Sequence, residues 1–146
     1  MKQRLLPAVL ATVFLILPNG AQAESPNDIL VVVNKGVKQD SISLGELKNL
    51  FLKDKTTWRS GQKVIPIHAS AGSPVRKAFV SRVLGMSIED EKLFWQKRKI
   101  KTGKIKPVEF RNTLKAVFKL RGSISYIFRS QYKERVAKVV LVLPAR

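Results

Sequence analysis

The residues best suited to chemistry lie in the stretch 67–85, which reads IHASAGSPVRKAFVSRVLG. Residues 70–72 form a short loop of small side chains. Ser73 and Pro74 then predict the start of a helix, because serine is a preferred N-cap and proline fits the first helical turn. A strand that leads through such a loop into a helix leaves backbone N–H groups unpaired at the positive end of the helix dipole, and this arrangement suits an anion.

The candidate anion site combines loop hydroxyls, backbone amides and one positive charge. Gly72 permits close approach of a ligand, the Ser73 hydroxyl donates a hydrogen bond, and Arg76 supplies charge. The alternative interpretation is purely structural, because most strand–loop–helix units bind nothing. The predicted oxyanion ligands are Ser70, Gly72, Ser73, Val75 and Arg76.

The remaining side chains do not make a set of groups typical of an enzyme. The chain has no cysteine, one histidine and ten acidic residues, and these do not combine into a nucleophile, a base and an orienting group. His68, at a strand end, is a candidate ligand or base, with a structural role as the alternative. Residues 89–91 are three consecutive acids, which fan around a helix and are explained by its dipole. The sequence therefore predicts no enzyme, no metal site and no cofactor.

A second candidate surface is cationic. The formal net charge is +18, from 28 basic and 10 acidic residues, and such an excess attracts anionic partners. The stretch 96–106 is rich in lysine and has Trp95 as an aromatic neighbour. A solvated helix end is the alternative interpretation. The predicted polyanion contacts are Lys97, Arg98, Lys99 and Lys101.

The N-terminus has the pattern of a signal peptide, residues 1–23. Lys2 and Arg4 precede an apolar run over 5–17, and the AQA of 21–23 matches a small-residue cleavage site. The apolar run is shorter than the about 20 residues needed to span a bilayer, and no cysteine follows it for attachment of a lipid. We therefore predict export to the periplasm or secretion, with no membrane span after cleavage.

Strands and helices alternate along the remaining 123 residues, which is enough for one domain. A polar leader, 24–28, is expected to be mobile, and a single domain follows over 29–146. The apolar run 29–33 predicts a strand buried on both faces within a parallel sheet. The alternation predicts an α/β fold with a mostly parallel sheet flanked by helices. Further strands are predicted over 63–67, 123–128 and 136–143, and helices from Ser43, Ser73, Ser87 and Pro107, the last with Phe110, Leu114, Val117 and Phe118 on one face.

Four segments, in this order, resemble the phosphate-binding proteins of ABC transporters, which have the type II periplasmic binding-protein fold. Residues 29–34 (ILVVVN) resemble the first strand of that family, and 43–58 (SLGELKNLFLKDKTTW) its helix with a following tryptophan. Residues 64–79 stand where the family has a strand, a Ser-Gly-Thr ligand loop and a helix. Residues 122–126 (GSISY) are similar to its Gly-x-Ile-Gly-Tyr strand. The resemblance covers most of 29–143 and implies one lobe of that fold.

The ligand loop departs from the family pattern in two ways. The family carries an arginine four positions before its serine, an acid two positions before it and Gly-Thr directly after it, and only Gly72 and Ser73 match here. The family also encloses its ligand between two lobes, whereas a single lobe leaves the site open to water, which competes for each polar contact. The departing positions hold Ala69, Ala71, Pro74 and Val75.

The resemblance implies an exported, non-enzymatic binding protein whose ligand is phosphate or a similar oxyanion and whose partner is an ABC transporter membrane component. The alternative is a degenerate lobe that no longer binds phosphate and acts as a protein-interaction module with another protein of the cell envelope. The missing arginine and threonine of the loop keep both hypotheses open. A third hypothesis is a polyanion binder acting through 96–106, with nucleic acid disfavoured because export removes the chain from most of it.

Overall fold

The computed structural model describes residues 23–146, so all of the predicted signal peptide except Ala23 lies outside the described residues. Within 23–146, no helix is long and apolar enough to cross a membrane. The described residues form a five-stranded sheet in the order β3-β2-β4-β1-β5. The strands are β1 (Ile29–Val33), β2 (Ile65–Ala69), β3 (Val108–Phe110), β4 (Ser123–Phe128) and β5 (Lys138–Leu143).

Four of the five strands run in the same direction. β2 pairs in parallel with both β3 and β4, whereas β1 is antiparallel to β4 and to β5. The predicted α/β fold with a mostly parallel sheet is therefore confirmed. β1 is fully buried along its length, as its apolar run predicts, but the expectation of parallel neighbours for this strand was wrong. A continuous apolar strand indicates that both faces are covered and carries no information on the direction of its neighbours.

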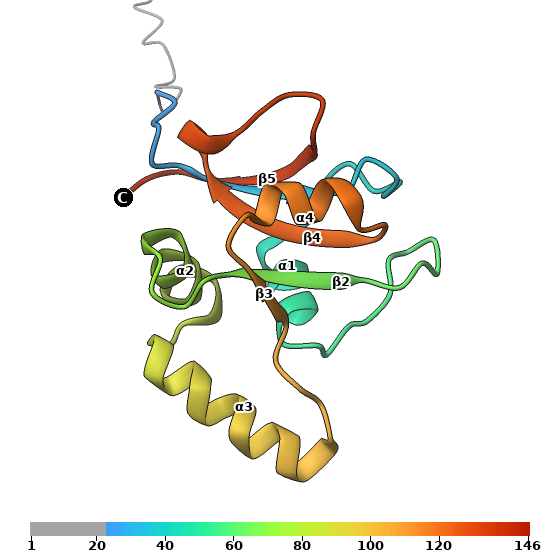
Figure 1. Cartoon of the computed structure of the whole chain (residues 1–146), viewed down its shortest axis with the longest axis vertical. Helices are drawn as coiled ribbons and strands as arrows, with labels where there is room; N and C mark the ends of the chain where they lie inside the picture. Colours follow the sequence, from blue (N-terminus) through green and yellow to red (C-terminus); the bar gives the residue numbers. More distant parts are fainter. Residues whose placement is uncertain (1–22) are drawn as a thin grey trace, which may run out of the picture.

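Helices cover both faces of the sheet (Figure 1). The odd-numbered residues of β1 belong to a core shared with α1 and α2, and its even-numbered residues to a smaller core under α4. This division follows from the two-residue period of a strand, which sends successive side chains to opposite faces. The helices are α1 (Leu44–Phe51), α2 (Pro74–Phe79) with the π-helical turn η1 (Val80–Leu84), α3 (Ile88–Thr102), α4 (Thr113–Lys119) and the short 3-10 helix η2 (Arg129–Gln131).

Three predicted serine caps are confirmed. The side chains of Ser43, Ser73 and Ser87 each accept a hydrogen bond from the backbone N–H three residues further on. These bonds satisfy amides that the first turn of a helix leaves without a partner. Gly85 follows η1 with a φ of 69°, the left-handed conformation that favours glycine at the end of a helix.

The start predicted for the last helix, at Pro107, was wrong. Residues 108–110 instead form the edge strand β3, and α4 begins at Thr113, where Asn112 accepts a hydrogen bond from the Lys115 amide. Leu114 and Val117 pack in the smaller core, but Phe118 is 57 % exposed, so only part of the predicted apolar face is formed. The helical spacing that suggested one long helix joined apolar residues that belong to two elements.

Two strand boundaries also differ from expectation, and the leader is anchored at its end. β2 begins and ends two residues later than predicted and so includes His68, and β5 begins at Lys138.

Asp28, the last residue of the predicted mobile leader, is 4 % exposed, and its carboxylate accepts from the amides of Ser25 and Ala145. These two backbone contacts hold the pKa of Asp28 below its usual value. The carboxylate therefore ties the two ends of the described chain together.

α3 is set apart from the rest of the fold. Figure 1 shows it beside the β3 edge of the sheet rather than over either face. Glu91 and Trp95 are its only buried residues. After α3 the chain turns back and runs to β3. The connecting segment therefore lies opposite α3 at this edge of the molecule.

Candidate functional site

The loop predicted to bind an anion has the expected strand–loop–helix geometry. Ser73, with φ −75° and ψ 145°, lies at the N-cap of α2. Its hydroxyl donates to the Ser70 carbonyl at 2.7 Å and accepts from the Arg76 amide at 3.4 Å, and its own amide donates to the Ser70 carbonyl. The serine hydroxyl is therefore used within the loop.

Two of the predicted ligands offer only backbone groups. Val75 is 7 % exposed because its side chain packs in the main core. A Cβ atom added at Gly72 would meet nothing within 4 Å, so space rather than close packing surrounds this residue. Among the described residues, the amides of Gly72 and Val75 have no hydrogen-bond partner.

A carboxylate from the neighbouring strand occupies the loop. Glu109 Oε1 accepts a hydrogen bond from the Ala71 amide at 3.1 Å, and Oε2 accepts from Lys106 Nζ at 3.1 Å. Glu109 lies here because β2 and β3 are parallel and in register, with His68 opposite Glu109. Burial alone would raise the pKa of Glu109, but its contacts with Lys106 and Arg76 hold that pKa below the usual value. The group facing the loop amide is thus a charged acid.

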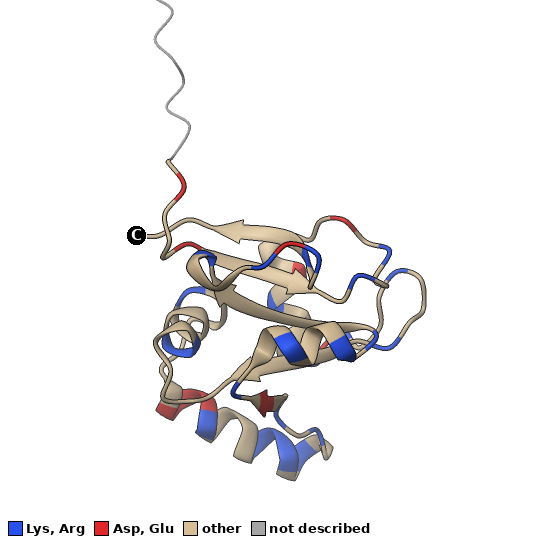
Figure 2. Ribbon diagram, turned by 45° about the horizontal axis from the view of Figure 1, so that its top comes forward, with Lys and Arg blue, Asp and Glu red and all other residues tan. Residues whose placement is uncertain are grey.

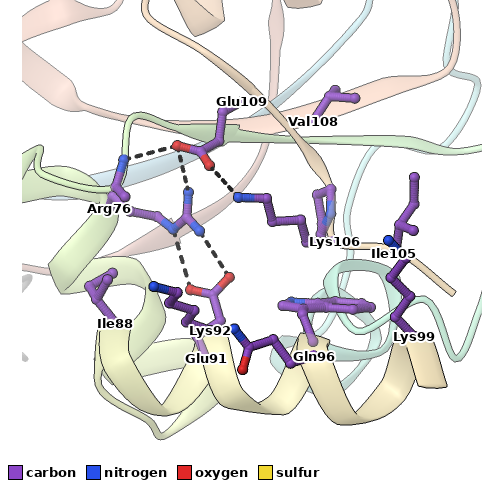
Figure 3. Close-up of a pocket in the computed structure, with 13 residues that line it drawn as sticks. Arg76, Ile88, Glu91, Lys92, Gln96, Lys99, Ile105, Lys106, Val108 and Glu109 are labelled. Carbon is purple, nitrogen blue, oxygen red and sulfur yellow. Dashed lines mark hydrogen bonds and ion pairs between the residues drawn. The ribbon is translucent and has the colours of Figure 1, made fainter. Parts of the chain in front are cut away.

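Arg76 is buried and paired, in contrast to its predicted role as a free charge for a ligand. It is 3 % exposed. Its guanidinium donates to both carboxylate oxygens of Glu91, at 2.9 and 3.4 Å, and to the Ala69 carbonyl at 2.7 Å. Its Nη1 also lies 3.8 Å from Glu109 Oε1. We call Arg76, Glu91, Lys106 and Glu109 the ion cluster (Figure 3). Its two positive and two negative charges balance.

His68 joins the ion cluster to the core. Its ring is fully buried, with Nδ1 2.7 Å from the Tyr126 hydroxyl and Nε2 3.1 Å from Glu91 Oε1. The Tyr126 oxygen accepts from the Ala69 amide, so its proton is free to point to Nδ1. This arrangement places the histidine proton on Nε2, facing the Glu91 carboxylate.

The protonation states follow from burial and from these contacts. Burial lowers the pKa of His68 and raises that of Tyr126, so both are neutral near pH 7. For Glu91, burial opposes ionisation, but contacts with His68 and Arg76 outweigh it and lower the pKa. The network therefore holds one buried carboxylate against one buried guanidinium, with neutral rings behind them.

The predicted polyanion contacts point in more than one direction: Lys97 and Lys101, four residues apart, share one exposed face of α3, whereas Arg98 and Lys99 point elsewhere. Lys97, Arg98 and Lys99 are consecutive, and consecutive helical residues point about 100° apart. Arg98 is bound to Asp54 at 2.5 Å and lies over the rings of Phe94 and Trp95. Figure 2 shows acids in the first turn of α3 and basic residues along its later turns, with further basic residues spread over the molecule.

A recess of about 610 Å³ lies next to the ion cluster, between α3 and the segment that leads into β3. Ala71, Arg76 and Glu109 close one end of it, α3 forms one wall, and residues 105–108 form the other. Figure 3 shows Ile105 and Lys99 at the end away from the ion cluster. Among residues 23–146, no group of three or more histidine, cysteine or acidic side chains could hold a metal ion.

Sequence reasoning missed the acids of this site. Glu91 was assigned to the helix dipole with its neighbours, yet it lies at the right spacing from Ile88 and Trp95 to share their inward face. That spacing was the available signal. Glu109 was missed because it depends on β3, which the predicted helix from Pro107 concealed.

Comparison with known proteins supports the fold. No protein-family model matches the sequence, and no curated protein matches it. Two solved structures match with a TM-score of 0.60 over 80 % of this chain: a phosphate ABC transporter substrate-binding protein from Clostridium perfringens with bound phosphate, at 18 % identity, and an ABC-type phosphate transport receptor from Vibrio cholerae, at 13 %.

The matches cover only part of those proteins. This chain spans 46 % of the first and 48 % of the second, about half of each. At such low identity the likeness establishes the fold. The resemblance predicted from the order of four sequence segments is therefore confirmed as a structural one: the described chain has the fold of one lobe of the phosphate ABC transporter substrate-binding proteins.

Proposed function

We propose that this chain is an exported, non-enzymatic binding module, in which the receptor lobe contacts another protein of the cell envelope rather than capturing free phosphate. Its likeness to transport receptors supports a binding role. The observation that carries the proposal is the Glu109 carboxylate on the Ala71 amide. The chain supplies its own anion to the loop.

A free oxyanion would have to displace or approach this carboxylate. Displacement breaks the contacts of Glu109 with Ala71, Lys106 and Arg76. Approach without displacement brings two negative groups together, and like charges in one site disfavour each other. Water also competes at this open loop. We expect any phosphate affinity to be millimolar or weaker.

The charge of Arg76 is not available to offset that repulsion. Glu91 already takes both bidentate hydrogen bonds of the guanidinium. Such forked pairs are among the stronger hydrogen bonds in proteins. Moving Arg76 toward a ligand would leave Glu91 buried without its main partner, which costs several kcal/mol.

The second candidate function is an oxyanion receptor, with phosphate or a similar ion as ligand and an ABC transporter membrane component as partner. The specific observation in its favour is that the amides of Gly72 and Val75 have no partner among the described residues. An ion bound there would lie at the start of α2, beside the Ser73 hydroxyl.

Calorimetric titration with phosphate and with sulfate separates the two candidates. We expect no heat of binding from the wild-type protein at millimolar ligand. Glu109→Gln removes the competing charge but keeps the side-chain size, and it should make weak anion binding measurable. Glu89→Gln is the matched control, because it makes the same charge change at an exposed position in the first turn of α3. Wild-type binding tighter than about 0.1 mM that Ser73→Ala abolishes would establish the receptor instead.

A photocrosslinking amino acid placed in turn at two exposed apolar positions tests for the protein partner. Ile100 on α3 is 87 % exposed and Phe118 on α4 is 57 % exposed. Large exposed apolar residues gather mostly on the α3 and β3 side, so crosslinks in cells should form from Ile100 and not from Phe118. Crosslinks to a transporter membrane component would favour the receptor, and equal crosslinks from both positions would contradict a defined contact face. The exposed apolar residues of the α3 and β3 side are Leu93, Ile100, Ile105, Val108 and Phe110.

A further inference from the structure

The recess between α3 and residues 105–108 has the size of a small-molecule site. Its volume of about 610 Å³ falls within the roughly 300–1,000 Å³ typical of ligand pockets. Arg76, Glu91 and Glu109 lie at one end of it, and the exposed residues Lys99 and Ile105 lie at the other, which is therefore open to solvent (Figure 3). It lies outside the loop to which the anion prediction applied.

Most of the surface exposed inside the recess is apolar, although charged side chains also line it. Trp95 and Ile88 lie on the α3 side, and Ile105, Pro107 and Val108 lie opposite. Ile105 is 57 % and Val108 49 % exposed, so the chain does not fill the recess with its own side chains. The α3 residues that line it recur every three or four positions, as one face of a helix requires. They are Ile88, Glu91, Lys92, Trp95, Gln96 and Lys99.

The charge that remains at the recess is positive. The ion cluster is balanced within itself. Lys92 and Lys99 also line the recess, and among the described residues neither takes part in an ion pair. Figure 3 shows Lys92 beside Glu91, and Lys99 at the opposite end next to Ile105. Lys99 is therefore the cation farther from the acids.

One donor in the wall also lacks a partner. The indole Nε1–H of Trp95 is buried and has no hydrogen-bond acceptor among the described residues. Trp58, the other tryptophan of the sequence, donates its Nε1–H to the Gly122 carbonyl at 2.9 Å. The two indoles thus report on two different environments, one in the wall of the recess and one in the core.

We infer that the recess binds a small amphipathic organic anion. The hydrocarbon or aromatic body of the ligand lies against Trp95, Ile105 and Val108, and its single acidic group pairs with Lys99 at the open end. A neutral apolar compound would leave Lys99 unused, and an inorganic anion would gain nothing from the apolar walls. This inference goes beyond the proposed function and does not depend on whether the loop binds phosphate.

The probe is decanoate, kept below its micellar concentration, with decanol and inorganic sulfate as comparison ligands. Binding is followed by the indole N–H signals in ¹H–¹⁵N correlation spectra. Decanoate should shift the Trp95 signal and leave that of Trp58 in place. Decanol should bind about three- to fivefold more weakly, the ratio expected from one charge-assisted contact near the surface. Sulfate should produce no shift at Trp95.

Two matched pairs of variants locate the site. Ile105→Asp puts a negative charge at the mouth of the recess and should weaken decanoate binding at least tenfold, whereas Ile100→Asp, the same change on the exposed side of α3, should not. Lys99→Gln should weaken binding about three- to fivefold, whereas Lys101→Gln should leave it unchanged. All four side chains are exposed, so each variant is expected to fold.

The outcomes that overturn the inference are distinct. Equal binding of decanol and decanoate would make the recess a neutral apolar site. A shift by sulfate, or binding to phosphatidylglycerol vesicles without binding to free decanoate, would assign it to an inorganic ion or to a membrane. Shifts that persist in Ile105→Asp would place the ligand elsewhere. None of these results bears on phosphate binding at the loop, which the calorimetric titration decides separately.

Discussion

The anion loop and the recess between α3 and residues 105–108 share the ion cluster as a common wall, but they differ in whether the protein's own side chains fill them. In the loop, the polar groups already have partners within the chain, because Glu109 accepts a hydrogen bond from the Ala71 amide and Arg76 pairs with Glu91. In the recess, apolar side chains such as Ile105 and Val108 remain uncovered. The polar site in the loop is therefore occupied by a side chain of the protein, whereas the apolar recess is not filled.

The difference shows how easily each kind of site is closed. One carboxylate from a neighbouring strand can take the place of a ligand oxygen, because it has the same charge and accepts the same hydrogen bond. The register that sets Glu109 opposite His68 is enough to achieve this. An apolar recess can be closed only by filling its volume, which no single side chain of β3 does.

The largest expected effect comes from breaking the wall between the two regions. Glu91→Ala leaves the Arg76 guanidinium buried with only the Ala69 carbonyl and the more distant Glu109 as partners. Removal of one member of a buried ion pair costs about 3–5 kcal/mol. The free energy of unfolding, measured by urea denaturation, should fall by that amount.

The double variant Arg76→Met with Glu91→Met sharpens this prediction. Because it removes both charges together, it should recover most of the lost stability. If the double variant is as unstable as Glu91→Ala, the wall depends on packing around these positions and not on pairing. Either variant should also change the shape of the recess, and so the Trp95 indole signal.

The next effect is a loss of stability on acidification. His68 has a lowered pKa in the folded state and a value near 6.5 when unfolded, so below about pH 6.5 the unfolded chain binds more protons. Glu91, with its pKa lowered from 4.5, extends the same trend to lower pH. Stability should therefore fall steadily as the pH drops from about 7. The midpoint of urea denaturation at a series of pH values measures this.

A histidine variant separates the two contributions. His68 is the only histidine of the chain, so the slope between about pH 7 and pH 5.5 belongs to it. His68→Gln should flatten that part of the profile and leave the loss at lower pH. A slope unchanged in His68→Gln would contradict the buried neutral histidine.

The local signals in the sequence were sufficient for most of the fold. Each of these signals depends on residues close together in the sequence. They are the serine caps at 43, 73 and 87, which mark helix starts, and the apolar run at 29–33, which marks a strand. The order of these elements also indicated the lobe. The direction of β1 relative to its neighbours escaped prediction, because those neighbours are more than 90 residues away along the chain.

The site was harder to predict than the fold, because its decisive contacts are long-range. The small-residue loop and its helix start were read from adjacent residues. The partner of Ala71 comes from β3, 38 residues later, and Arg76 reaches Glu91 on α3. A lone arginine in a first helical turn looks free in a sequence. Only tertiary structure shows that an acid has already neutralised it.

The smallest effect compares the helix caps on the two sides of the ion cluster. Ser73→Ala and Ser87→Ala each remove a hydroxyl that accepts from a first-turn amide, and each should lower the free energy of unfolding by about 1 kcal/mol. The two should differ in the Trp95 indole signal. α2 is held by Val75 and Phe79 in the core, whereas α3 buries only Glu91 and Trp95, so loss of the Ser87 cap should loosen the wall of the recess and shift that signal. A shift from Ser73→Ala of equal size would mean that loop and recess move together, and the contrast between them would not hold.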